Sequence, residues 1–396
     1  MVTRITIYHR IYGWHRHGHE LPPGQLAAAL QIALQFAKHF DFYAGKSSTV
    51  KRCSAARNKS FTMLGSVLAS LLFAIDASAE NWADDVFWAI DLSTRAQYLS
   101  EDAPSQLGFF NSIGIDASKT YASGKRDIVK LNLQLNLWCI NGLTRRPGFF
   151  DGEDDCQVVS KVTTANFAVR GDGKLNFLVG HPEVPFGLEV PVSTSQTLRQ
   201  LTNARNLGLK LDWAVGLNGT IGGLQYATTY GRGSGMKYKD TNDPFSIAGR
   251  IGTATDSEAF LGDPGVGLSW FLGDVLTRTG AISERWRMGL DGIFYRGPVG
   301  LMGQISVGET DSRDTINGLT EINLISRSAT TVGYLQLRTF NERFTSGWKD
   351  AWSVVAGARF TPDSHWAVSV QVEKELTTFG ANPEQTIFDF QLRYRL

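Results

Sequence analysis

The chain has 396 residues, 42% hydrophobic residues and 41 glycines, so it can bury a sizeable surface and form many turns. Its formal charge of +1 hides an asymmetry: residues 1–79 hold nine of the 39 Lys and Arg but only three of the 38 Asp and Glu, which leaves residues 80–396 at −5. This mildly acidic balance argues against a nucleic-acid-binding protein, which would show a clustered basic excess.

Residues 50–79 have the three parts of a secretory signal peptide. A basic stretch over residues 51–59 precedes an apolar core over residues 63–75, and Ala-Ser-Ala at residues 77–79 forms a small-x-small cleavage site. The alternative is a transmembrane helix, but that would need about 20 apolar residues. We predict export and a mature N-terminus at or near Glu80.

Residues 1–49 precede this signal, although signal peptides act at the N-terminus. We interpret these residues as an upstream extension that results from a gene start placed too early, with translation beginning near Val50. The alternative is a functional extension. The mature protein would then span residues 80–396.

From residue 86 onward, the chain repeats segments in which apolar and polar residues alternate. Residues 129–137, VKLNLQLNL, are the clearest case, and the last nine residues, FDFQLRYRL, close the chain in the same way. A period of two predicts a β-strand with one apolar and one polar face. We identify fifteen such segments, among them residues 207–217.

Tight turns alternate with longer connections between these segments. The tight turns lie at residues 123–126, 170–174, 220–223, 296–298 and 361–365, and the longer connections at residues 141–155, 182–205, 232–244, 277–283 and 309–323. Short turns on one side and long loops on the other are typical of an outer-membrane β-barrel. A soluble β-sandwich would rarely contain so many two-faced strands of membrane-spanning length.

The alternation of the turns also predicts the number of strands. If both termini lie on one side, the tight turn at residues 361–365 requires one further strand between residues 309 and 350. We therefore predict an all-β protein, a transmembrane antiparallel barrel of 16 strands, with 14 or 12 as alternatives. Five aromatic residues on outward faces should form an interfacial belt: Trp88, Trp286, Trp352, Trp366 and Tyr394.

The alternation assigns charged residues to the lumen wall as well. The basic ones are Lys130, Lys210, Arg285, Arg287, Arg359, Arg393 and Arg395. Acidic residues such as Asp212, Asp291 and Asp389 share this face, so the sequence predicts no strong ion selectivity. The arginines near residue 286 and at the C-terminus hint at a strip that favours anions.

Two cysteines lie in the mature chain, at the bases of one predicted loop. Cys139 and Cys156 form an even pair in an exported protein, which predicts a disulfide; free thiols are the alternative. The acidic run at residues 151–155 could bind Ca²⁺ or contact lipopolysaccharide through divalent ions. The simpler interpretation is a solvated loop.

One short motif carries a resemblance to a known family. The sequence Pro-Phe-Gly-Leu-Glu at residues 185–189 looks like a stretch of the phosphate-selective porins, and a barrel of 16 strands with a long third loop resembles the bacterial outer-membrane porins. In general porins this loop folds into the pore. The resemblance thus implies homotrimers and a pore constriction that includes Glu183, Glu189, Arg199 and Arg205; ordinary solvated loop charges are the alternative.

The resemblance implies the architecture and not the substrate. Phosphate selectivity is associated with lysine-rich loops, and residues 182–205 contain no Lys; the chain also ends in Leu396 instead of the usual aromatic residue. We predict an outer-membrane porin for passive diffusion of small hydrophilic solutes or ions, in contact with lipid and lipopolysaccharide. The alternative is a structural barrel that sheathes a partner such as an outer-membrane cytochrome.

An enzyme is not expected, and neither is a cofactor. Beyond residue 79 the chain has only His181 and His365, which is too few for a catalytic His constellation, and no Cys-x-x-Cys-His motif for a c-type haem is present.

Overall fold

The computed structural model describes residues 86–100, 106–124, 126–142, 156–170, 173–194, 197–237, 242–254, 261–277, 279–379 and 384–396. The predicted signal peptide and the upstream extension lie outside the described residues, as does the acidic run at 151–155. Within the described ranges, no helix has the length and apolar character to cross a membrane.

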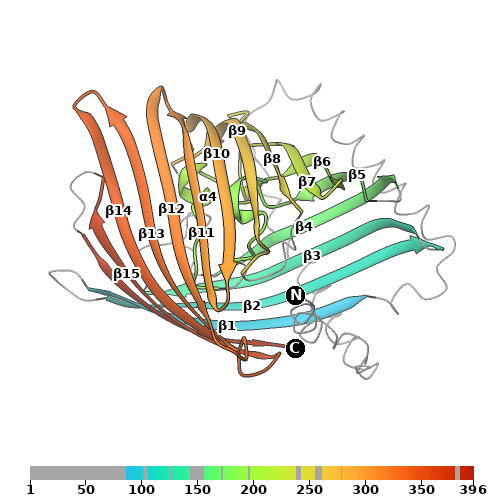
Figure 1. Cartoon of the computed structure of the whole chain (residues 1–396), viewed down its shortest axis with the longest axis horizontal. Coiled ribbons are helices and arrows are strands. Elements are labelled where there is room, and N and C mark those ends of the chain that lie inside the picture. Colours follow the sequence, from blue (N-terminus) through green and yellow to red (C-terminus); the bar gives the residue numbers. More distant parts are fainter. Residues whose placement is uncertain are drawn as a thin grey trace, which may run out of the picture. The chain divides into compact units, whose positions relative to one another are not determined.

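The described strands form one closed antiparallel barrel of 16 strands, in which β1 pairs with β16 (Figure 1). The predicted fold class and strand number are confirmed. In chain order the strands are β1 (Phe87–Ser100), β2 (Gln106–Ser123), β3 (Arg126–Asn141), β4 (Cys156–Arg170), β5 (Leu175–His181), β6 (Ala214–Ile221), β7 (Leu224–Gly231), β8 (Phe245–Thr253), β9 (Gly265–Leu276), β10 (Ile282–Arg296), β11 (Val299–Thr310), β12 (Arg313–Ile325), β13 (Thr331–Phe344), β14 (Gly347–Phe360), β15 (Trp366–Thr377) and β16 (Thr386–Arg395).

The alternation of residue types matches the two faces of the wall. On β16, Phe388 and Phe390 are 43% and 47% exposed on the outer face, whereas Asp389 and Gln391 are buried on the inner face. A closed sheet pairs every strand on both edges, so its outer apolar face can meet lipid without unpaired backbone groups. The aromatic residues Trp88, Trp286 and Trp366 are exposed on the outer face, as predicted.

The strand inferred between residues 309 and 350 is β12. The connection predicted at residues 309–323 is wrong, because Asp311 and Ser312, both with positive φ, form a two-residue turn directly between β11 and β12. Such turns usually contain Gly or Asn, and this one has neither. The alternation on β12 is also weak, since Leu319 points inward and is 3% exposed.

The strand predicted over residues 207–217 is wrong in its first half. β6 begins only at Ala214, and Leu207, Leu209 and Leu211 are buried in a loop instead. The buried loop segment before β6 has the same alternation of apolar and polar residues as a strand. The loop between β5 and β6 therefore extends over residues 182–213, and the strands β5–β8 around it are short, at seven to nine residues, against 14 to 18 for β1–β4.

Candidate functional site

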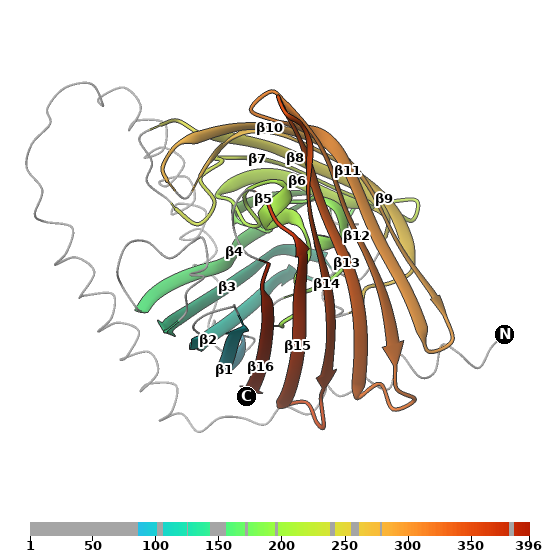
Figure 2. The ribbon, with the colours of Figure 1, turned by 90° about the vertical axis from the view of Figure 1, so that its left-hand side faces the viewer.

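Residues 182–194 and 197–213 of the loop between β5 and β6 lie inside the barrel and are called the inward loop below. It contains two short helices, η2 (Gly187–Glu189) and α4 (Asn203–Asn206), and Figure 1 shows α4 within the ring of strands. The same segment lies inside the ring in Figure 2, which is turned by 90°. η2 contacts β9, β10 and β11. The inward loop therefore rests on one side of the inner wall.

Apolar packing holds the inward loop against that wall. One cluster joins Phe186 and Leu207 of the loop to Phe271 and Val275 of β9, and a second joins Leu188 of the loop to β10, β11 and β12. These wall positions face inward but are apolar. Each buried side chain of this kind contributes about 1.5–3 kcal/mol, so the loop position is strongly favoured.

Hydrogen bonds fix the loop backbone at specific wall residues. The amide of Gly187 donates to Ser269 Oγ at 2.9 Å, and the amide of Leu188 donates to Gln304 Oε1 at 2.9 Å. Asn206 Nδ2 donates to Ser306 Oγ at 2.9 Å. The first two bonds satisfy backbone amides that the barrel interior hides from water, and the third satisfies a buried side-chain amide.

Arg199 forms a buried ion pair with the wall. Its Nη1 lies 3.2 Å from Glu321 Oε1 on β12, and both side chains are fully buried. Gln336 Nε2 donates a second hydrogen bond to Glu321. Arg199, predicted at the constriction, lies at the wall, where its guanidinium supplies the cation that the buried carboxylate on β12 needs.

Arg205 is exposed, unlike Arg199. Its guanidinium lies 4.0 Å from the ring centroid of Phe340 and 5.4 Å from that of Phe379. Its backbone carbonyl accepts a hydrogen bond from Arg285 Nη1 at 3.3 Å. Arg205 therefore lies against β13 and the chain just after β15, apart from the acidic residues of the loop.

Glu183, Glu189 and Lys210 form a charged cluster on the inward loop. Lys210 Nζ lies 2.9 Å from Glu189 and 3.7 Å from Glu183, and it also donates to Thr194 Oγ1. Burial raises the pKa of Glu183, and the nearby Glu189 adds to this while Lys210 opposes it. Burial acts to lower the pKa of Lys210, but Glu189 and Glu183 together raise it, so Lys210 stays charged at neutral pH.

Asp212 holds the start of the neighbouring β7–β8 connection. Its carboxylate accepts hydrogen bonds from the amides of Gly233 and Gly235, at 2.7 Å and 3.1 Å, and from Ser246 Oγ at 2.6 Å. Burial raises its pKa, and these hydrogen bonds oppose that rise. Asp212, predicted on the lumen wall, thus joins the inward loop to the next loop.

A cavity of about 710 Å³ lies beside the inward loop, lined by residues of β1–β4, of the β7–β8 connection and of β9, β10 and β16. Among the described residues, its lining contains five basic side chains and one acidic side chain, Glu183; the basic ones are Arg95, Lys161, Lys210, Lys237 and Arg285. Two of the five have carboxylate partners, Arg95 in Asp389 and Lys210 in Glu189, so these two add little to the positive excess. An excess of one charge at a narrow part of a pore selects ions of the opposite sign. This cavity is the candidate functional site.

No protein-family model and no curated protein sequence matches the chain. Several solved structures share its fold. The loop L8 deletion mutant of OmpT, an outer membrane protein of Vibrio cholerae, aligns at 13% identity with a TM-score of 0.57, covering 78% of this chain and 99% of its own. An anion-selective porin from Comamonas acidovorans aligns at 13% identity with a TM-score of 0.53, covering 79% and 99%.

OprB of Pseudomonas putida aligns at 8% identity with a TM-score of 0.57, covering 78% of this chain and 94% of its own. The three alignments span nearly the whole length of each solved chain and match a closed barrel of 16 strands. The chain has the fold of a porin-like barrel. At such low identities the likeness shows the fold alone.

The basic residues predicted on the lumen wall of the porin-like barrel lie in different surroundings. Arg287 on β10 is 2% exposed and donates to Asn206 Oδ1 at 2.9 Å, so the inward loop covers it; Lys210 belongs to that loop. Arg285 lines the cavity. Lys130 lies on the inward-facing side of β3, and Arg359 lies on that of β14.

The remaining two predicted wall arginines lie on β16 and pair with carboxylates of neighbouring strands. Arg393 Nε lies 2.9 Å from both Oδ1 and Oδ2 of Asp91 on β1, and Arg395 Nη2 lies 3.1 Å from Asp116 on β2. Their charges are therefore largely balanced by the wall itself.

Several residues that line the cavity were not singled out from the sequence, among them Arg95, Phe110, Trp138, Lys161 and Met236. Arg95, Phe110 and Trp138 sit at inward positions of predicted strands, so the alternation contained their signal. Lys161 lies where the pairing of β3 and β4 shifts register, and such a bulge is not visible in the alternation.

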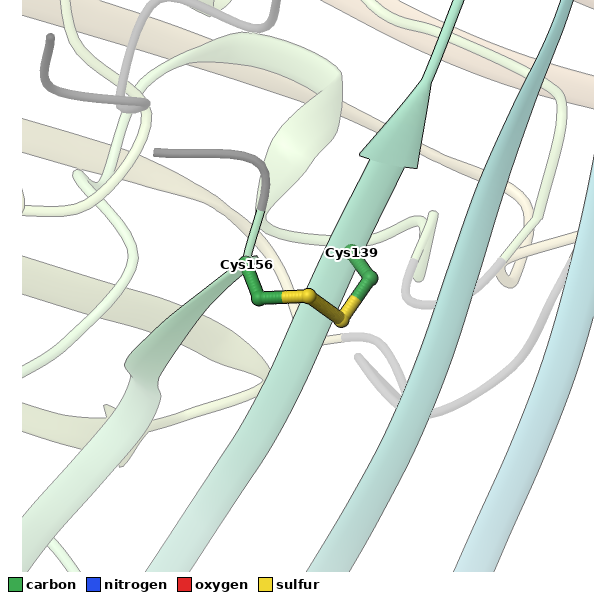
Figure 3. Close-up of a disulfide and its surroundings, with 2 residues drawn as sticks. All are labelled: Cys139 and Cys156. Atoms are coloured by element: carbon green, nitrogen blue, oxygen red, sulfur yellow. A yellow bond between two sulfur atoms is a disulfide. The ribbon is translucent and has the colours of Figure 1, made fainter. Parts of the chain in front are cut away.

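The predicted disulfide is confirmed. Cys139 near the end of β3 and Cys156 at the start of β4 are bonded and lie opposite each other in the strand pairing (Figure 3). The bond closes the base of the connection over residues 142–155. It therefore fixes where this loop leaves the barrel.

Both histidines in the described part of the chain contact backbone carbonyls. His181 Nδ1 lies 3.1 Å from the carbonyl of Ser160 and its ring stacks on Trp213 at 4.8 Å, while His365 Nδ1 lies 2.7 Å from the carbonyl of Arg395. No group of three or more His, Cys, Asp or Glu that could hold a metal ion occurs in the described part of the chain.

Proposed function

We propose that the porin-like barrel is a channel for passive diffusion of small hydrophilic solutes across the bacterial outer membrane, with a preference for anions. The observation that carries the proposal is the cavity beside the inward loop, with its five basic side chains and one acidic side chain among the described residues. One solved neighbour is described as an anion-selective porin, which supports the same preference.

The mechanism needs no chemical step. The apolar outer face meets lipid, the closed wall leaves no unpaired strand edge, and the inward loop narrows the water-filled lumen. Solutes pass if they fit between the loop and β1–β4. Anions are concentrated there because the basic side chains attract them.

The constriction role of Glu183, Glu189 and Arg205 stays a proposal, and Lys210 joins them in it. Glu183 and Lys210 line the cavity, and Glu189 forms an ion pair with Lys210. Arg205 is exposed on the same loop. We also propose homotrimers, contact with lipid and lipopolysaccharide, and export by a cleaved signal peptide; the trimer form of Vibrio cholerae OmpT supports the first of these.

The packing of the inward loop makes a sheath for a partner protein less favourable. A partner threaded through the lumen would have to displace the two buried apolar clusters that join the loop to the wall. The prediction that the chain is not an enzyme stays a prediction; His181 and His365 both face backbone carbonyls, which supports it.

A liposome-swelling assay tests passive diffusion directly. Proteoliposomes that hold the purified protein should swell in isotonic arabinose, faster than in a larger sugar such as raffinose. Equal swelling with protein-free liposomes would contradict the proposal. Mass spectrometry of the purified protein tests the export signal: an N-terminus near Glu80 is expected, and peptides from residues 1–49 would contradict it.

A further inference from the structure

An aromatic patch lies in the wall of the cavity, where a passage for hydrophilic solutes does not require one. Phe110 of β2 and Trp138 of β3 face the lumen with their ring centroids 5.5 Å apart, and Met236 of the β7–β8 connection packs against them. All three residues line the cavity. Trp138 packs with Ile140 and Val159 and keeps 8% of its surface exposed, so Phe110 and Met236 supply most of the accessible apolar surface. A hydrated pore needs only polar walls, so this patch indicates a more specific contact.

A cation lies at the edge of this patch. Lys161 Nζ is 5.7 Å from the ring centroid of Trp138, and Lys161 also lines the cavity. Arg95 of β1 and Lys210 of the inward loop line the same cavity. The site thus offers an aromatic surface and ammonium and guanidinium groups together.

The position of Lys161 is built into the backbone. Lys161 lies in the bulge of β4, between Ser160, which pairs with Leu135, and Thr163, which pairs with Leu133. The ring of His181 lies against this bulge, with Nδ1 2.5 Å from the carbonyl of Lys161. Bulges re-aim side chains at barrel rims and binding sites, and here the bulge is held by a buried ring.

We propose that this cavity binds aromatic organic anions, in which a carboxylate is attached to an aromatic ring. The ring would pack on Trp138 and Phe110, and the carboxylate would meet Lys161 and the other cations of the cavity. An inorganic anion would gain nothing from the aromatic patch, and a neutral sugar would gain nothing from the excess of basic side chains. The proposal rests on the proposed channel function and specifies its substrate class.

Benzoate is the probe that tests this class. In planar bilayers with the purified protein, benzoate should reduce the chloride current in a saturable way, whereas acetate and maltose at the same concentration should not. Calorimetric titration of the detergent-solubilised barrel with benzoate measures binding without any channel. Binding of benzoate can therefore be measured even if no channel current is seen in the bilayer. A barrel that conducts ions but does not bind benzoate would overturn the proposed substrate class and leave the channel function standing.

Three variants locate the site. Trp138→Leu should raise the half-saturating benzoate concentration about 2- to 10-fold, because the ring contact is lost. Lys161→Gln should raise it about tenfold, because a hydrogen bond to a charged group is lost. Trp366→Leu, on the outer face, is the matched control and should leave benzoate binding unchanged.

Folding is checked by the shift of the unheated barrel on gels, and Phe110→Leu replaces Trp138→Leu if the latter does not fold. Saturable benzoate binding that both cavity variants weaken supports the proposal. Equal effects of benzoate and acetate, tighter binding of maltose, or unchanged binding in a folded Trp138→Leu or Phe110→Leu barrel would overturn it.

Discussion

Asp91 on the first strand and Arg393 on the last strand form an ion pair in the barrel interior, with Arg393 Nε 2.9 Å from both carboxylate oxygens. A second pair crosses the same seam in the opposite sense, from Arg95 on β1 to Asp389 on β16 at 2.9 Å. The two pairs join segments separated by about 300 residues. They therefore join the first and last strands, where the barrel closes.

Removal of one partner at this seam should weaken the barrel. Arg393→Leu leaves the carboxylate of Asp91, which is fully buried, without its cation, at a cost of about 3–5 kcal/mol. Unfolding in urea, followed by the loss of the compact gel form, measures the change. Arg296→Leu, in an exposed position at the end of β10, is the control and should change stability by less than about 0.5 kcal/mol. Equal stability of the two variants would show that the seam pair is dispensable.

The ion pair of Arg199 and Glu321 should hold the inward loop in place. Arg199→Met leaves Glu321 buried and unpaired with its main cation, so the loop should detach more often, and single-channel current should become noisier and larger. The expected loss of stability is about 3 kcal/mol. Arg343→Met is the control, because Arg343 and Asp314 form an exposed pair worth at most about 1 kcal/mol.

The double variant Arg199→Met with Glu321→Met separates charge from packing. Two apolar side chains in place of a buried pair remove the uncompensated charge, so stability and a quiet current should return in part. A current in Arg199→Met that matches the native protein would contradict an anchoring role for this pair.

Channel selectivity should depend on pH through Glu183. Burial and the neighbouring Glu189 raise the pKa of Glu183, so this carboxyl becomes neutral, as pH falls, at a higher pH than an ordinary Glu. The groups that face it are Lys210, Glu189 and Lys161. Its charge is −1 above the pKa and zero below it, so the preference for anions should increase on acidification.

Reversal potentials in a KCl gradient between pH 4 and pH 8 measure this change. Glu183→Gln should prefer anions at every pH as strongly as the native channel does at acid pH, because it lacks the carboxyl that titrates. Glu284→Gln, at an exposed position on β10, is the control and should titrate like the native channel. If the reversal potential of Glu183→Gln changes with pH as it does in the native channel, another group is responsible for the change.

The disulfide should add stability without affecting conduction. Cys139 and Cys156 are separated by 17 residues, and closure of a loop of that size stabilises a fold by about 3 kcal/mol. The double variant Cys139→Ser with Cys156→Ser should unfold at lower urea concentration and show the native conductance. A changed conductance would mean that the loop after β3 reaches the channel.

Alternation predicted most of the barrel because lipid imposes an apolar residue at every second position of each strand. The disulfide between Cys139 and Cys156 was predictable for another reason, because the two cysteines are an even pair at the bases of one loop. Alternation failed where the inner wall is itself apolar, as at Leu319 on β12, and where a buried loop repeats the period of a strand, as at Leu207, Leu209 and Leu211. In both places the cause is the inward loop, whose contacts are long-range.

The candidate site was predictable only in part. The charges of Glu183 and Glu189 were recognised on the third loop, but Lys210, which pairs with them, was assigned to a strand. Arg199 looked equivalent to Arg205 in sequence, yet one meets a buried carboxylate and the other an aromatic ring. Such differences depend on which wall residue lies opposite, and the alternation does not specify that.

The current through the purified native protein in a planar bilayer with a KCl gradient is the direct test of passive diffusion with a preference for anions. We predict stepwise channel insertion and a reversal potential of the sign given by chloride passing more easily than potassium. A folded protein that inserts but stays silent, or channels that prefer potassium, would contradict it.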